Sequence, residues 1–296
     1  MITFTGLTAI VRGGELGHHD QLSPPAPWWS LTKAALAAGA LVLVAGGRLE
    51  LDASLAGRPF TLRQLLQHTA GLPDYGGLPA YHEAVARRAE PWSADELLRR
   101  VSADTLLFSP GQGWAYSNVG YFFVRRLIEE ATGEEVDAAL RRLVFGPLGV
   151  PGVRLARSPS DLTVTAWGNV ARYQPGWVYH GLLIGTPAEA ALFLDLLLSG
   201  PLLPSDLRDA MERPHPLGGP VPGRPWRTAG YGLGLMVDVA SPRGRCSGHT
   251  GQGPGSTAAA YRFADLDPPC TAAAFAPVED QGLVERTVLA LPEAMS

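Results

Sequence analysis

Lysine and cysteine are both scarce in this sequence, and acidic residues outnumber basic ones. Of the 24 basic residues among 296, only Lys33 is a lysine, and the formal net charge is −4. A chain without excess positive charge lacks the field that holds nucleic acid or an anionic membrane surface, so we expect neither partner. The two cysteines, Cys246 and Cys270, cannot form a disulfide framework. One bridge between them is possible, but two free, buried thiols are favoured.

The sequence also lacks a long hydrophobic run. The longest, residues 34–45, is too short to span a bilayer and begins directly after a lysine. The N-terminal residues contain neither a cationic segment nor a long apolar stretch, which argues against secretion. With 46% hydrophobic residues, the chain is expected to be a folded protein of the cytoplasm.

Several widespread site motifs are missing. There is no Gly-x-Ser-x-Gly, which excludes the hydrolases that carry their nucleophile on a strand-to-helix elbow. A phosphate-binding loop ending in Gly-Lys-Ser/Thr cannot exist, because the only lysine follows a threonine. His18, His19 and His68 lack the spacing of a zinc pair, and the two cysteines have no partner cluster. We therefore expect no metal and no cofactor.

Strand-like segments lie at both ends of the chain, and helix-like segments lie between them. This order predicts an α/β (α+β) fold, in which residues 1–49 and 226–296 form an antiparallel sheet flanked by helices. Residues 50–225 would be a large all-helical insertion. The clearest expected elements are strands at 3–12, 231–240, 256–263 and 271–276, and helices at 30–46, 117–131, 186–199 and 281–295.

The first group of residues that carries chemistry is Ser30-Leu31-Thr32-Lys33, at the start of a predicted helix. A spacing of three puts the hydroxyl and the only amine on one helix face, within reach of each other. A serine is a weak nucleophile until a neighbouring base takes its proton, and a lysine removed from water can do so, whereas an arginine cannot. The alternative is that Ser30 merely caps the helix.

A second group, Tyr116-Ser117-Asn118, begins the next long helical segment. A cationic amine nearby can lower the pKa of a tyrosine phenol and so make it a second base and proton shuttle. The amide of Asn118 can donate to an acyl carbonyl and accept from the lysine. On its own, this pattern favours the simpler interpretation of a packed aromatic side chain at a helix start.

The third group lies in residues 248–253, a glycine-rich segment in the predicted strand region that contains His249, Gly251 and Gln252. Small residues on an edge strand allow a substrate backbone or acyl group to lie against the sheet. The alternative is an ordinary glycine-rich hairpin.

In this order, the three groups resemble the signatures of the serine β-lactamase and penicillin-binding-protein superfamily. Tyr-Ser-Asn as the second and His-Thr-Gly as the third are similar to its class C-type branch, which includes esterases, D-amino-acid peptidases and amidases besides lactamases. Residues 65–73, 108–111 and 231–234 also resemble segments common in that branch. The resemblance extends over residues 3–277 and implies a β-lactamase/transpeptidase-like fold, with its active site at the interface of sheet domain and insertion.

The resemblance also implies a role for each matching residue. Ser30 would be the nucleophile that accepts the acyl group, and Lys33 would activate it. Tyr116 would be the acid/base that returns a proton to the leaving group. The remaining implied residues are Asn118, His249 and Gly251 for binding and orienting the substrate, and Ser30 and Gln252, through their backbone N–H groups, for the oxyanion hole.

His249 departs from the pattern of the lactamases and carboxypeptidases, which usually carry a lysine there whose charge helps to bind a substrate carboxylate. A histidine, with an ordinary pKa of about 6.5, is mostly neutral at pH 7. The sequence therefore favours a small ester as substrate, then an amide or D-configured peptide, then a β-lactam, although Arg243 or Arg245 could still supply the charge. The alternative is a binding module that kept the fold without turnover. The natural substrate and the oligomeric state do not follow from the sequence.

Overall fold

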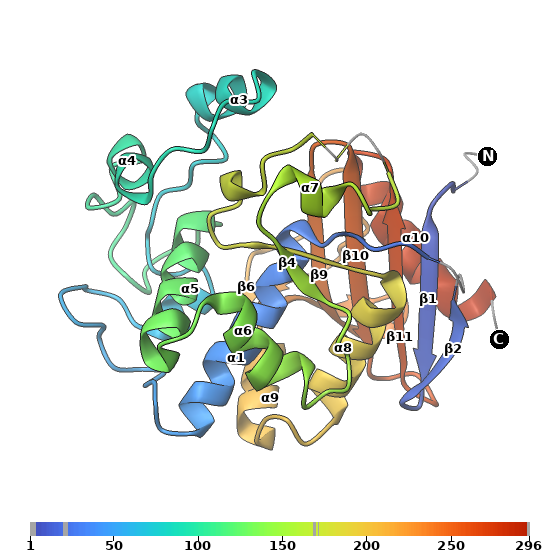
Figure 1. Ribbon diagram of the computed structural model, residues 1–296. Coiled ribbons are helices and arrows are strands. Elements are labelled where there is room, and N and C mark those ends of the chain that lie inside the picture. Colours follow the sequence, from blue (N-terminus) through green and yellow to red (C-terminus); the bar gives the residue numbers. More distant parts are fainter. Residues whose placement is uncertain (1–3, 20–22, 168–169, 171, 295–296) are drawn as a thin grey trace.

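The structure is a computed structural model that describes residues 4–19, 23–167, 170 and 172–294 (Figure 1). Its strands are β1 (Leu7–Arg12), β2 (Glu15–His19), β3 (Ala26–Pro27), β4 (Arg154–Ala156), β5 (Leu182–Gly185), β6 (His215–Pro216), β7 (Ala229–Tyr231), β8 (Met236–Ser241), β9 (Gly244–Gly253), β10 (Ser256–Phe263) and β11 (Cys270–Ala276). Its α-helices are α1 (Thr32–Ala45), α2 (Leu62–Leu66), α3 (Pro79–Ala86), α4 (Ala94–Arg100), α5 (Asn118–Thr132), α6 (Val136–Leu140), α7 (Pro159–Leu162), α8 (Pro187–Ser199), α9 (Ser205–Glu212) and α10 (Gln281–Ala294).

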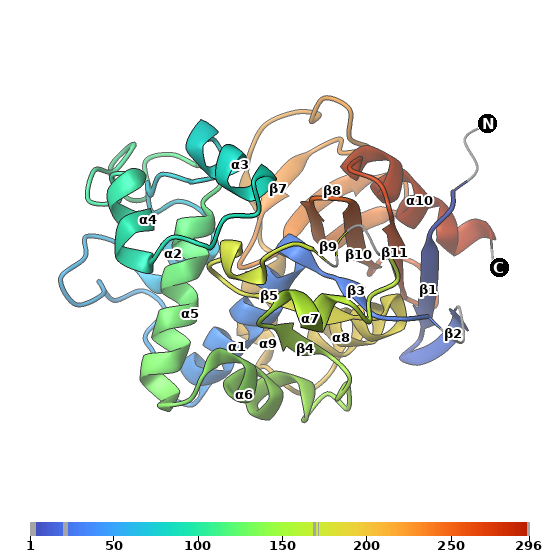
Figure 2. The ribbon, with the colours of Figure 1, turned by 45° about the horizontal axis from the view of Figure 1, so that its top comes forward.

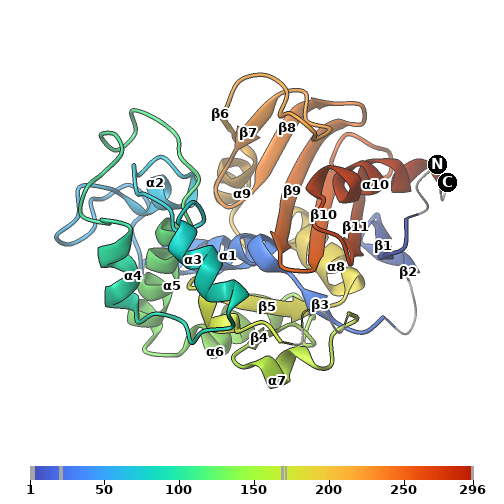
Figure 3. The ribbon, with the colours of Figure 1, turned by 90° about the horizontal axis from the view of Figure 1, so that it is seen from above.

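An antiparallel sheet of eight strands forms one side of the molecule, in the order β2-β1-β11-β10-β9-β8-β7-β6 (Figure 3). Strands from both ends of the chain pair directly, because β1 runs beside β11 with Leu7 opposite Phe275 and Arg12 opposite Cys270. The sheet is flanked by helices, so the predicted fold class is confirmed.

The two faces of the sheet are covered by different helices. Along β10, Ala258 and Ala260 belong to the core that includes α8, whereas Ala259 and Tyr261 pack with Val284 of α10. This alternation follows from the two-residue period of a strand. Small side chains on both faces allow α8 and α10 to approach the sheet from opposite sides (Figure 3).

Helix α1 lies at the centre of the molecule, between the large sheet and the helices on its other side (Figures 1 and 2). Its residues from Thr32 to Leu41 are all buried, which accounts for a sequence that is apolar on every side. The predicted helix at 30–46 is confirmed except at its start, because a 3₁₀ turn over Trp29–Leu31 precedes α1. Ser30 therefore lies in a tight turn, next to Trp29 with its positive φ of 47°.

The segment 50–225 is not helical throughout, which corrects the prediction of an all-helical insertion. Strands β4 and β5 of this segment form a three-stranded sheet with β3. Short apolar runs such as Leu182–Gly185 cannot be assigned to strand or helix by periodicity, so this sheet gave no clear signal. Helix α8 lies in the same segment but covers the large sheet. The division of the chain at residues 50 and 225 stays a prediction.

Most other predicted elements are found, with shifted ends. Helix α5 begins after Ser117, whose hydroxyl accepts from the Gly120 N–H, and ends at Gly133 in the left-handed conformation. A capping box at Thr186 starts α8. The first strand begins at Leu7 rather than at residue 3, and the end of the closing helix expected at 295 lies, like residue 3, outside the described residues.

The two cysteines are free and buried, as favoured from the sequence. Both are aligned with Phe263 of β10, Cys246 on β9 and Cys270 on β11, so a whole strand separates them. Among the described residues, none of the helices combines the length and the apolar character needed to cross a bilayer.

Candidate active site

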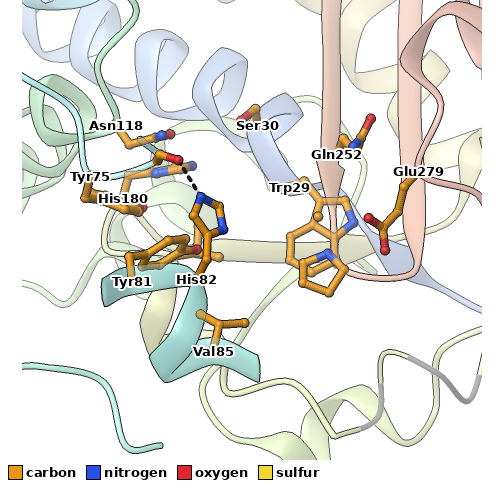
Figure 4. Close-up of a pocket in the computed structure, with 14 residues that line it drawn as sticks. Trp29, Ser30, Tyr75, Tyr81, His82, Val85, Asn118, His180, Gln252 and Glu279 are labelled. Carbon is orange, nitrogen blue, oxygen red and sulfur yellow. Dashed lines mark hydrogen bonds between the residues drawn. The ribbon is translucent and has the colours of Figure 1, made fainter. Parts of the chain in front are cut away.

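A pocket of about 310 Å³ opens where the turn before α1 meets the end of β9 (Figure 4). Ser30 lies between two walls. One wall comes from the sheet side and the other from α3, the start of α5 and the segment before β5. The sheet-side wall consists of Trp29, Gln252, Gly253, Pro254 and Glu279, and the opposite wall of Tyr75, Gly76, Tyr81, His82, Val85, Asn118, Val178 and His180.

The hydroxyl of Ser30 and the amine of Lys33 are in contact, as their spacing predicts. Lys33 Nζ lies 3.1 Å from Ser30 Oγ, and the Lys33 side chain is completely buried. Burial lowers the pKa of Lys33 from 10.5 to about 7, and the nearby Asp74 carboxylate opposes that shift. Near pH 7, a substantial fraction of the amine is therefore neutral and has a lone pair that can accept the serine proton.

Asn118 joins the pair through its side-chain oxygen, which accepts from Lys33 Nζ at 2.7 Å. Asp74 determines which way this amide points, because it accepts from Asn118 Nδ2 at 3.2 Å and from the Asn118 backbone N–H at 2.7 Å. Sequence reasoning missed Asp74. Nothing in the motif spacing shows that the loop after Pro73 lies against the first turn of α5.

Tyr116 lies beside the pair, with Lys33 Nζ 4.9 Å from its ring centroid and a hydrogen bond to Ser30. Burial raises the pKa of Tyr116 well above its ordinary value of 10, and the hydrogen bond with Ser30 offsets only part of this. The expectation of a lowered phenol pKa is therefore wrong, because desolvation outweighs any help from the amine. In the resting site Tyr116 is a phenol that can donate a proton. His68 packs on its ring at a centroid distance of 4.4 Å.

Strand β9 brings the third group of residues against the turn that contains Ser30. A Cβ added to Gly251 would lie 2.5 Å from the Ser30 backbone nitrogen, so only glycine allows this approach. Gln252 follows at the pocket wall. The backbone N–H groups of Ser30 and Gln252 stay the predicted oxyanion hole.

His249 lies behind the pocket rather than in its wall. Its side chain is fully buried, with Nε2 2.8 Å from the Tyr231 hydroxyl and Nδ1 2.8 Å from the Thr250 carbonyl oxygen. Burial and then the charge of Lys33 lower its pKa to about 3, so the ring is neutral, as expected. His249 is not among the residues that line the pocket, and its contact with substrate stays a prediction. Gly251, on the same strand face, already packs on the Ser30 turn, so His249 faces the interior.

Two further residues of the pocket, His180 and Glu279, were given no catalytic role from the sequence. His180 lies next to Lys33, with Nε2 3.4 Å from Nζ. Glu279 follows β11 and accepts from the Gly255 N–H at 2.7 Å. Both enter the pocket from segments far from the three motifs, and only the folded chain shows their place. Within the described ranges, no three His, Cys, Asp or Glu side chains gather as a metal site.

Comparison with known proteins gives a consistent result. The family model described as Beta-lactamase matches residues 25–276. Penicillin-binding protein 4* of Bacillus subtilis strain 168 is 27% identical over 304 residues, which cover 88% of this chain and 66% of that protein. Esterase EstB of Burkholderia gladioli is 34% identical over 142 residues, which cover 41% of this chain and 36% of that protein.

Solved structures share the fold. A D-stereospecific amidohydrolase from a Streptomyces species superposes with a TM-score of 0.79, at 24% identity, over 99% of this chain and 95% of that one. The chain spans at most two thirds of the length of the two curated relatives described above. Because the family match covers most of its length, this chain belongs to the Beta-lactamase family.

Proposed function

We propose that this protein is a metal-independent serine hydrolase that works through a covalent acyl-enzyme. The observation that carries the proposal is the contact between Ser30 Oγ and a buried Lys33 amine with a pKa of about 7. Lys33 Nζ takes the proton of the Ser30 hydroxyl, Oγ forms a bond with the substrate carbonyl carbon, and the π electron pair moves to the carbonyl oxygen. The electron pair on that oxygen then re-forms the carbonyl and the bond from carbon to the leaving group breaks, while the Tyr116 phenol gives a proton to the leaving group and regains one from the Lys33 ammonium. Water then hydrolyses the acyl-enzyme.

A small ester is the favoured substrate class, followed by an amide or D-configured peptide and then a β-lactam. The charge of the pocket supports a substrate without a carboxylate, because Glu279 is the only residue of the lining with a full charge, and no lysine or arginine lines the pocket. Tyr75, Tyr81 and Val178 offer an apolar surface for an acyl or alcohol group. The similar proteins include an esterase, a D-aminopeptidase and an amidohydrolase, so the order of esters and amides rests on the charge of the pocket and not on the comparisons.

A fluorophosphonate probe is expected to label Ser30 of the wild-type protein, because such probes react with activated serines. The label is located by mass spectrometry of peptides, and Ser30→Ala is the control. Absence of a label on Ser30, with Ser30→Ala indistinguishable from the wild type, would instead support a binding module that keeps the fold without turnover.

Replacement of Glu279 by lysine should raise turnover of a carboxylate-bearing ester relative to a neutral ester of the same size, by roughly tenfold in the ratio of kcat/KM values. The substitution replaces a negative charge at the pocket by a positive one. In the wild type, the Gly255 N–H donates to the Glu279 carboxylate and holds it at the rim. Asp280→Lys changes the net charge equally but does not lie in the lining, so it is the matched control. The same ratio in both variants would show that Glu279 does not affect selection by charge.

A further inference from the structure

The Lys33 amine has three polar neighbours, which differ in their ability to donate and to accept hydrogen bonds. Nζ lies 2.7 Å from Asn118 Oδ1, 3.1 Å from Ser30 Oγ and 3.4 Å from His180 Nε2. Asn118 Oδ1 can only accept, because Asp74 binds the nitrogen of the same amide. The serine hydroxyl can either donate to the amine or accept from it, and the role of His180 Nε2 depends on which ring nitrogen carries the proton.

His180 is placed to accept as well. Its side chain is 2% exposed, and it lies on the same side of the pocket as Asn118 (Figure 4). A charged lysine has three N–H donors and no acceptor, so Nε2 must accept when Lys33 is protonated. The ring proton is then on Nδ1, which has no hydrogen-bond partner among the described residues.

A neutral amine has two N–H groups and one lone pair, so the direction of the lone pair depends on which neighbours take the N–H groups. We propose that His180 is a positioning residue that accepts one N–H of neutral Lys33 while Asn118 accepts the other, which leaves the lone pair directed at the Ser30 hydroxyl. In this arrangement Ser30 donates its O–H to Nζ, and the proton moves along that bond as Oγ attacks the carbonyl carbon. The inference rests on the proposed acyl-enzyme function.

Loss of the His180 acceptor would reverse the direction of the hydrogen bond between Lys33 and Ser30. The unused N–H of the neutral amine would then turn to Ser30 Oγ, its only other acceptor within reach in the described structure. The serine would accept a hydrogen bond instead of donating one, and its proton would point away from the base. The expected effect is on the acylation step and not on the binding of substrate.

The test compares two substitutions of similar size at position 180. His180→Gln keeps a side-chain oxygen that can accept near the position of Nε2, whereas His180→Leu fills the space without an acceptor. Acylation is followed as the burst of p-nitrophenol from a p-nitrophenyl ester in stopped flow, together with KM, and thermal unfolding reports on the fold. His180→Phe, which also lacks an acceptor, replaces the leucine variant if that variant does not fold.

We expect the leucine variant to lose at least tenfold in burst rate with KM changed less than threefold, and the glutamine variant to stay within threefold of the wild type. Equal rates in all three proteins, or equal losses in both variants, would overturn the role of His180 as an acceptor. These outcomes are distinct from failure of the proposed function, which would appear as a wild-type protein that neither gives a burst nor labels at Ser30.

Discussion

Replacement of Lys33 by arginine should lower the rate of Ser30 acylation by about a thousandfold or more, because a guanidinium stays charged and cannot take the serine proton. In the part of the chain that the structure describes, no second base replaces the amine at Ser30 Oγ, since the phenol of Tyr116 has a raised pKa and His180 Nε2 has its hydrogen-bond contact with Lys33. The burst of p-nitrophenol from an activated ester and the rate of fluorophosphonate labelling both measure this step.

The control for this prediction is Lys33→Met, because an arginine in a fully buried site can disturb the fold. Methionine fills a similar volume without charge and should be equally inactive. Either variant would contradict the proposed role if it were folded and kept more than about a tenth of the wild-type rate, which corresponds to ~1.4 kcal/mol of barrier at most.

The second large effect concerns stability. The same Lys33→Met variant should have a higher free energy of unfolding than the wild type, and the difference should be larger at pH 6 than at pH 9. Burial lowers the pKa of Lys33 from its ordinary 10.5 to about 7 in the folded protein. Between these pH values the unfolded chain binds a proton that the folded protein lacks, so the free energy of unfolding of the wild type rises with pH. Methionine does not titrate, and the advantage of the variant should shrink by roughly 2–3 kcal/mol from pH 6 to pH 9.

Urea denaturation of both proteins at several pH values measures this difference. Groups that titrate equally in the two proteins cancel when their unfolding free energies are subtracted. A difference that stays constant from pH 6 to pH 9 would mean that Lys33 keeps an ordinary pKa in the folded protein, and the basis for its action as a base near neutral pH would be lost.

Much of the fold follows from local patterns. The apolar sequence of α1 indicates a central helix, and the capping residues Ser117 and Thr186 lie immediately before α5 and α8. The small sheet of β3, β4 and β5 was not anticipated, because its strands have two to four residues and no measurable alternation. Their pairing depends on contacts between distant segments, which a single sequence does not reveal.

The site also contains residues that the sequence predicts and residues that it does not. Contact between Ser30 and Lys33 follows from helical spacing, and Asn118 was found through its motif. Asp74 and His180 act on the same amine but come from loops, where neither periodicity nor spacing predicts a position. The pKa of Tyr116 was predicted in the wrong direction because a neighbouring amine is visible in the sequence, whereas complete burial of a phenol is not.

Because β1 pairs with β11, the large sheet cannot be completed until the last strand has been synthesised. During synthesis, Ser30 leaves the ribosome long before the strand that will face it. Until β9, β10 and β11 have been made, β1 has only β2 beside it, and the turn with Ser30 lacks the backbone of Gly251 against which it packs. A growing chain therefore holds the serine and the amine without a pocket, and the pocket is completed only with the last quarter of the polypeptide.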